Sequence, residues 1–111
     1  MREATVYRHL YRSQVVYGHF RQFVDISREI SALERSRGWA VSTIWTPTVG
    51  IANEAVIIAD YESLASFEQE RAARYADSEY MRLARQAAAL MAQGTFRDEL
   101  LEEAPNLVDA S

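Results

Sequence analysis

A chain of 111 residues, of which 49% are hydrophobic and 25% charged, has the composition of a globular domain, which excludes intrinsic disorder and leaves little room for a second core. The formal net charge of −4 repels phosphate backbones, so we expect no nucleic acid as a partner. The absence of cysteine excludes disulfides, thiolate metal sites and cysteine nucleophiles, and it suits a reducing cytoplasm.

The first third of the sequence predicts a strand and then a long helix. Residues 1–5 lack the apolar run of a signal peptide or membrane helix, so we expect a cytoplasmic protein without a membrane partner. Side chains of two kinds alternate over residues 5–12, as in a strand, and apolar residues then recur every three or four positions from residue 16 to residue 33. Gly38 follows basic residues and is the expected helix end, because glycine tolerates a positive φ.

The middle third predicts a hairpin. Residues 39–46 alternate again and form the expected second strand, with Trp39 and Trp45 on the same face. Residues 47–50 contain a proline and a glycine, which favour a turn. Residues 51–61 are then almost continuously apolar, which predicts a central strand that is buried on both faces.

The last third predicts a second helix and a weak final strand. Ser63 can cap this helix, and Asp77 is a second capping candidate, so we expect a break near Ala76. Gly94 ends the helical segment. Residues 95–101 form the expected last strand, and the acidic residues within it favour a position at the sheet edge.

The order strand-helix-strand-strand-helix-strand predicts an α+β fold, with one antiparallel sheet and both helices on one of its faces. We expect a single domain over residues 1–101, followed by an acidic tail at residues 102–111. Large apolar residues occur at both parities of the predicted strands, so the uncovered face would expose a large apolar patch. A second copy of the sheet would cover it, which predicts a homodimer closed into an α+β barrel.

Three segments, residues 47–54, 60–71 and 77–80, resemble the NIPSNAP-type proteins of the dimeric α+β barrel superfamily, whose subunits are ferredoxin-like. The resemblance covers nearly the whole chain in plan. It implies several activities: cofactor-independent quinone-forming monooxygenation, haem degradation and lactone isomerisation. The members that degrade haem use asparagine, tryptophan and histidine together, but this sequence has no asparagine before Asn53 and no histidine after His19, which argues against haem degradation.

His9 is the candidate catalytic residue, because an imidazole can move protons near neutral pH. The alternative is that His9 is a hydrogen-bonded sheet residue and that His19 lies on the surface. The two histidines lack any carboxylate partner at metal-ligand spacing, so we expect no metal, and no feature of the sequence implies another cofactor.

Four further residues are candidates for ligand binding. Tyr11 and Trp45 could line an aromatic pocket for a ring-shaped substrate, or fill a core or interface. Asn53 lies where the resemblance is strongest, and the alternative is that it fixes the hairpin. Arg71 lies beside the apolar stripe of the second helix, as does Arg74, so one of these guanidinium groups could bind an anion, or pair with a nearby acid.

These candidates predict a protein that binds a small aromatic ligand between the sheet and the helices. Its enzymatic form would be a cofactor-independent monooxygenase or isomerase acting on an aromatic or polyketide-like compound. The alternative is a non-enzymatic binding or assembly module, whose acidic tail would recognise a partner chain.

Overall fold

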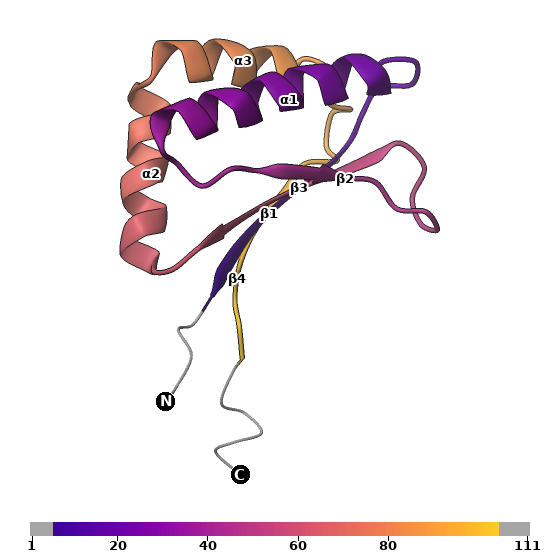
Figure 1. Cartoon of the computed structure of the whole chain (residues 1–111). Coiled ribbons are helices and arrows are strands. Elements are labelled where there is room, and N and C mark those ends of the chain that lie inside the picture. Colours follow the sequence, from indigo (N-terminus) through magenta and orange to yellow (C-terminus); the bar gives the residue numbers. More distant parts are fainter. Residues whose placement is uncertain (1–5, 105–111) are drawn as a thin grey trace.

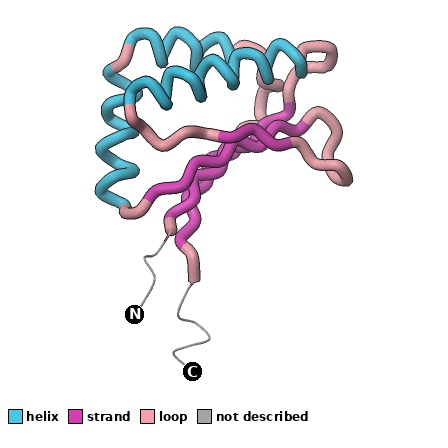
Figure 2. Tube along the Cα trace, in the orientation of Figure 1, coloured by secondary structure: helices cyan, strands magenta, loops and turns pink. Residues whose placement is uncertain are grey.

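The computed structural model of the chain describes residues 6–104, which form a four-stranded sheet with three helices (Figure 1). All helices lie on one side of the sheet, and the loop between the second and third strands projects beyond it (Figure 2). In chain order the elements are β1 (Tyr7–Gln14), α1 (Phe20–Arg37), β2 (Thr43–Trp45), β3 (Glu54–Tyr61), α2 (Leu64–Ala76), α3 (Ser78–Ala88) and β4 (Arg97–Glu102).

The sheet has the strand order β2-β3-β1-β4, and every neighbouring pair is antiparallel. The prediction of an α+β, ferredoxin-like fold is therefore confirmed, as is the edge position of the last strand. In the register of β1 with β3, His9 lies opposite Ala59 and Tyr11 opposite Ile57. Since side chains alternate across a strand, these residues all point toward the helices, and their chain neighbours point away.

The first strand extends further along the chain than the sequence predicts. β1 continues to Gln14, and Val15 still forms an isolated bridge with Met91, so the residues just after position 13 extend the sheet. Gly18, with φ 87°, turns the chain, and α1 begins only at Phe20. The predicted end of this helix is confirmed, because Gly38 has φ 76° and its N–H donates to the last carbonyls of α1.

The prediction that Trp39 and Trp45 share a face of one strand is wrong, because β2 covers only residues 43–45. The backbone before it bonds to side chains instead of to a neighbouring strand. The N–H of Ala40 donates to Glu70 at 2.7 Å and that of Ser42 to Glu34 at 2.9 Å. Trp39 consequently lies against α2 and α3, outside the period-two pattern of β2.

The predicted break in the second helix is confirmed at Asp77. The Ser63 hydroxyl accepts from the N–H of Ser66 at the start of α2, and Ser66 bonds back in a capping box. The Asp77 carboxylate accepts from the N–H of Tyr80 and from the Arg37 guanidinium, both at close range. This pairing holds the α2–α3 junction against the end of α1, so the two short helices approach the sheet at different angles.

The face of the sheet without helices is mixed in character. Apolar Val56 and Ile58 point to it, and Trp45 is 59% exposed there. Ion pairs also cross it: Arg8 meets Asp60 at 2.8 Å, and Arg12 lies 3.3 Å from Glu99. The expected apolar patch is thus interrupted, because paired charges lie among the apolar side chains of this face.

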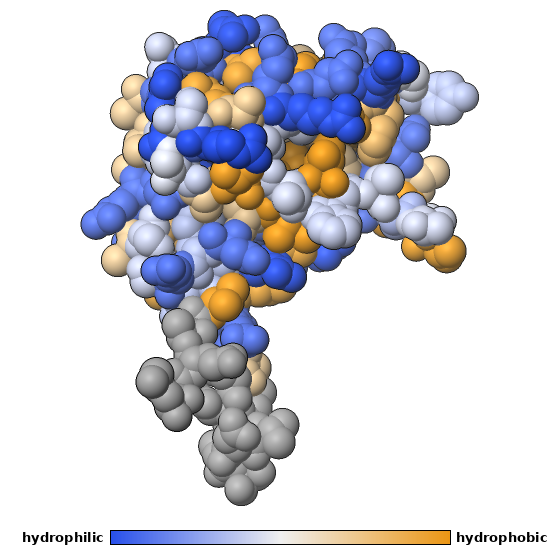
Figure 3. Space-filling model, viewed as in Figure 1, coloured by the Kyte–Doolittle hydropathy of each residue, from blue (hydrophilic) through white to orange (hydrophobic). Residues whose placement is uncertain are grey.

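Figure 3 shows hydrophilic residues over most of the helical layer and apolar ones at the projecting loop. In that loop Val49 is 93% exposed. β4 extends through Glu102, so the strand includes the first residue assigned to the acidic tail. Residues 105–111 of that tail lie outside the described residues, and so does the hypothesis that the tail recognises a partner.

A buried ion pair joins the helices to the sheet. The Arg74 guanidinium on α2 donates to the Glu34 carboxylate on α1 at 3.0 Å and to the Tyr61 hydroxyl on β3 at 2.9 Å. It also donates to the carbonyl of Ala40 at 2.9 Å. Both members of the pair are almost fully buried. One guanidinium on α2 therefore joins α1, β3 and the segment that follows α1.

Replacing Arg74 by methionine should destabilise the protein by about 3–5 kcal/mol, because the Glu34 carboxylate would stay buried without its partner. Replacing both residues by methionine should restore part of that loss, since no isolated charge remains buried. Urea unfolding measures both effects. Arg71→Met, on the same helix but at an exposed position, is the control. A loss below about 1 kcal/mol for Arg74→Met would contradict the assigned role.

Candidate functional site

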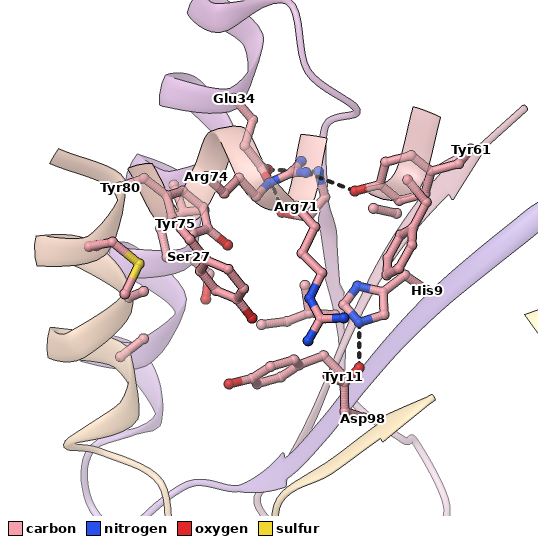
Figure 4. A pocket seen from close by; sticks show the side chains of 18 of the residues that line it. His9, Tyr11, Ser27, Glu34, Tyr61, Arg71, Arg74, Tyr75, Tyr80 and Asp98 are labelled. Atoms are coloured by element: carbon pink, nitrogen blue, oxygen red, sulfur yellow. Dashed lines mark hydrogen bonds and ion pairs between the residues drawn. The ribbon is translucent and has the colours of Figure 1, made fainter. Parts of the chain in front are cut away.

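A cavity of about 190 Å³ lies between the helices and the sheet (Figure 4). Its floor comes from β1 and β3 and its walls from all three helices, while β4 contributes one acidic side chain. The polar residues that line it are His9, Tyr11, Ser27, Glu34, Ser42, Tyr61, Arg71, Arg74, Tyr75, Tyr80 and Asp98. The other lining side chains are apolar, so the cavity combines an apolar wall with several polar groups, as small-molecule sites do.

His9 and Asp98 form a hydrogen-bonded pair at the side of this cavity. The Nε2 atom of His9 faces the Oδ1 atom of Asp98, and Figure 4 shows the contact. Asp98 lies opposite Tyr11 in the β1–β4 register, so it is a diagonal neighbour of His9 on the same sheet face. The His9 ring also packs edge-on against Phe67, with 5.4 Å between ring centroids. Both the carboxylate and the phenyl ring therefore fix its orientation.

Four tyrosines line the cavity, and the environment keeps at least two of their phenols protonated. Burial, together with the nearby Asp98 and Tyr75, raises the pKa of Tyr11 to about 12. Burial likewise raises the pKa of Tyr80 to about 12, although the Arg74 cation opposes this rise. At neutral pH these phenols are hydrogen-bond donors with aromatic faces, which suits recognition of a planar, oxygen-bearing compound.

Arg71 reaches the cavity from α2, and its guanidinium points toward Tyr11 and His9 (Figure 4). It stacks over the Tyr75 ring at 5.6 Å. Among residues 6–104 no carboxylate forms an ion pair with it. Arg74, in contrast, is occupied by Glu34 and enclosed by aromatic rings, at 5.2 Å from that of Trp39. Of the two arginines singled out in the sequence, Arg71 is thus the one free to meet an anion.

The structure brings three of the five predicted site residues together and separates two. His9, Tyr11 and Arg71 line the cavity. Trp45 does not, because Ile44 packs against the core and the alternation of β2 turns Trp45 to the opposite face. Asn53 lies in the turn before β3 with φ 59°, where its carbonyl accepts from the N–H of Val15. Asparagine adopts this left-handed conformation more readily than most residues, which accounts for its position.

Sequence reasoning missed Asp98 and Ser27. Asp98 is one of the acidic residues of the predicted last strand, and its pairing with His9 depends on the β1–β4 register, which no sequence pattern gives. Ser27 lies on α1 among apolar residues and is 5% exposed. A serine on the buried face of an amphipathic helix is the one available signal, since a hydroxyl there needs a partner.

Within residues 6–104, no group of three or more histidine and acidic side chains is placed to hold a metal ion. None of the helices in this range is both long and apolar enough to cross a membrane.

Comparison with known proteins gives the family. No curated protein matches the chain. A NIPSNAP family protein from Agrobacterium tumefaciens str. C58 superposes with a TM-score of 0.75 at 12% identity, over 94% of this chain and 90% of that one. An uncharacterized NIPSNAP domain protein from Burkholderia xenovorans gives 0.72 at 16%, over 88% and 94%. A mutant of SnoaB, a cofactor-independent oxygenase from Streptomyces nogalater, gives 0.67 at 19%, over 93% and 97%.

At such identities these structures agree with this chain in fold. The NIPSNAP family profile matches residues 11–103. This range begins within β1, at Tyr11, and includes all three helices and the other three strands. Because this match spans most of the sequence, the chain belongs to the NIPSNAP family.

Proposed function

We propose that the cavity binds a small ring-shaped compound and that His9, oriented by Asp98, removes a proton from it. The observation that carries this proposal is the hydrogen-bonded His9–Asp98 pair beside a cavity lined by tyrosines and by Arg71. A base held by a carboxylate next to a partly apolar pocket is the arrangement that proton abstraction requires.

The orientation of His9 decides which nitrogen acts. When Asp98 accepts the proton of Nε2, the lone pair of the neutral imidazole lies on Nδ1, which is then the base. The anion formed on the ligand would be delocalised over its rings. The Arg71 guanidinium and the protonated Tyr11 phenol, whose pKa is about 12, would stabilise that negative charge.

Two outcomes of this deprotonation fit a site without a cofactor. In cofactor-independent oxygenation, the carbanion gives electrons to dioxygen, and overall a ring methylene and dioxygen become a ring carbonyl and water. In isomerisation, the proton returns to another carbon. We favour oxygenation, because the similar fold of SnoaB belongs to a cofactor-independent oxygenase. The proposed substrate class is aromatic or polyketide-like in either case.

Binding is tested by thermal shift with a panel of two- and three-ring phenols and ketones. At least one compound should raise the melting temperature of the wild-type protein, since a ligand of the native state stabilises it. His9→Ala should reduce or abolish the shift. His19→Ala is the matched control, because His19 is exposed just before α1 and its side chain bonds only to Gln22 among the described residues. Equal shifts for both variants would contradict a role for His9.

The reaction is tested with an oxygen electrode and a ring compound that carries an acidic methylene. Wild-type protein should consume one dioxygen per carbonyl formed, and both His9→Ala and Asp98→Asn should lower the rate by about a hundredfold or more, the usual contribution of a positioned base. Conversion of the compound to an isomer without oxygen uptake would favour isomerisation. No conversion of any bound compound would contradict the enzymatic part of the proposal.

We also propose that the chain forms a homodimer through the helix-free face of the sheet. Trp45, which is 59% exposed, lies there with Val56 and Ile58, and Leu101, which is 48% exposed, lies on β4 at the other edge of the same face. The ion pairs Arg8–Asp60 and Arg12–Glu99 would border the contact. A second copy presents the same apolar strip and the same paired charges, so a two-fold arrangement can match them.

Sedimentation tests this proposal. The wild-type chain should sediment as a dimer at micromolar concentration, and Trp45→Glu should shift it to a monomer, because a carboxylate would be buried without a partner in the contact. Leu64→Glu, at a 47% exposed position on α2, is the control and should leave the dimer intact. A wild-type monomer at this concentration would overturn the proposal.

A further inference from the structure

Two buried side chains in the described part of the chain have hydroxyl groups without any hydrogen-bond partner, those of Ser13 and Ser27. Ser13 lies on β1 beneath the core and is 2% exposed, and Ser27 lies on α1 and is 5% exposed. A buried hydroxyl without a partner costs about 1–3 kcal/mol. Only the Ser27 side chain lines the cavity. A ligand atom in the cavity could therefore supply the hydrogen-bond partner that the Ser27 hydroxyl lacks.

Among the charged groups of the cavity, too, some have a partner within the protein and one lacks an ion-pair partner among residues 6–104. The Glu34 carboxylate accepts from Arg74 and from Ser42, and the Asp98 carboxylate meets His9. Arg71 lines the cavity without an ion-pair partner within residues 6–104. An exposed cation on α2, Arg71, and a buried hydroxyl on α1, Ser27, thus have no partner of these kinds within residues 6–104.

We propose that Ser27 and Arg71 together select the ligand: a planar ring compound with a carboxylate, held by Arg71, and a hydroxyl or keto oxygen, held by Ser27. This inference rests on the proposed function and names its substrate class. Charge-assisted bonds favour the carboxylate over a neutral group at Arg71, and the Ser27 hydroxyl can donate to a keto oxygen or accept from a hydroxyl. The apolar wall and the tyrosine faces between them would hold the rings.

The test measures dissociation constants by calorimetry for three probes: a hydroxynaphthoate with its two groups on different rings, its methyl ester, and the naphthoate without the hydroxyl. Wild-type protein should prefer the hydroxynaphthoate over the ester by about tenfold and over the naphthoate by about threefold or more. Arg71→Met should remove the first preference and keep the second. Ser27→Ala should do the reverse.

Ser13→Ala is the matched control, because it removes the other partnerless hydroxyl from a position outside the cavity. It should leave both preferences unchanged. Ser27→Ala should in addition raise the melting temperature of the ligand-free protein by about 4 °C, since it removes an unsatisfied hydroxyl from a helix and introduces alanine.

The outcomes separate this inference from the function on which it rests. If the three probes bind but with equal affinity, or if the variants leave both preferences intact, the selection by Ser27 and Arg71 is wrong and the ring-binding cavity stands. If Ser27→Ala lowers the melting temperature, the hydroxyl has a structural partner and the inference is overturned. If neither the probes nor any compound of the thermal-shift panel binds the wild-type protein, both proposals fail.

Discussion

The contact of Arg74 with Glu34 is the interaction on which the rest of the structure depends. A guanidinium has enough donors to bond several acceptors at once, and here it reaches α1, β3 and the segment before β2. The rings of Trp39, Tyr61 and Tyr80 lie within 6 Å of it, and less than a tenth of either side chain of the pair is exposed. The interaction stabilises the fold only as a complete network, because either charge alone would be buried without compensation.

The same network gives the cavity its shape. Glu34, Tyr61 and Arg74 line the cavity, and the ion pair neutralises two charges that would otherwise face a ligand. What remains open is a site with one available cation, one oriented imidazole and neutral phenols. The break at Asp77 contributes as well, since it lets Tyr75 on α2 and Tyr80 on α3 line the same cavity from two helix directions.

Local signals in the sequence were sufficient for most of the fold. The capping serine at position 63, the aspartate at 77 and the glycine at 38 act through their own backbone neighbourhood, so their effects could be predicted. The start of β2 could not, because Ala40 and Ser42, which the sequence places in this strand, donate their N–H groups to the side chains of Glu70 and Glu34 instead. The site shows the same limit. His9 and Arg71 could be chosen as candidates from their side-chain type and position, whereas Asp98 becomes their neighbour only through the β1–β4 register.

The register of β4 against β1 depends on hydrogen bonds just outside the two ends of β4. β4 is held by one neighbour, and a slip by two residues would keep every side chain on its present face while moving Asp98 away from His9. Residues outside the cavity oppose this slip: the Thr95 hydroxyl accepts from the N–H of Gln14 at 3.0 Å, and the N–H of Glu103 donates to the carbonyl of Val6 at 2.8 Å. The pairing of His9 with Asp98 is therefore secured from the two ends of an edge strand, by residues that lie outside the cavity.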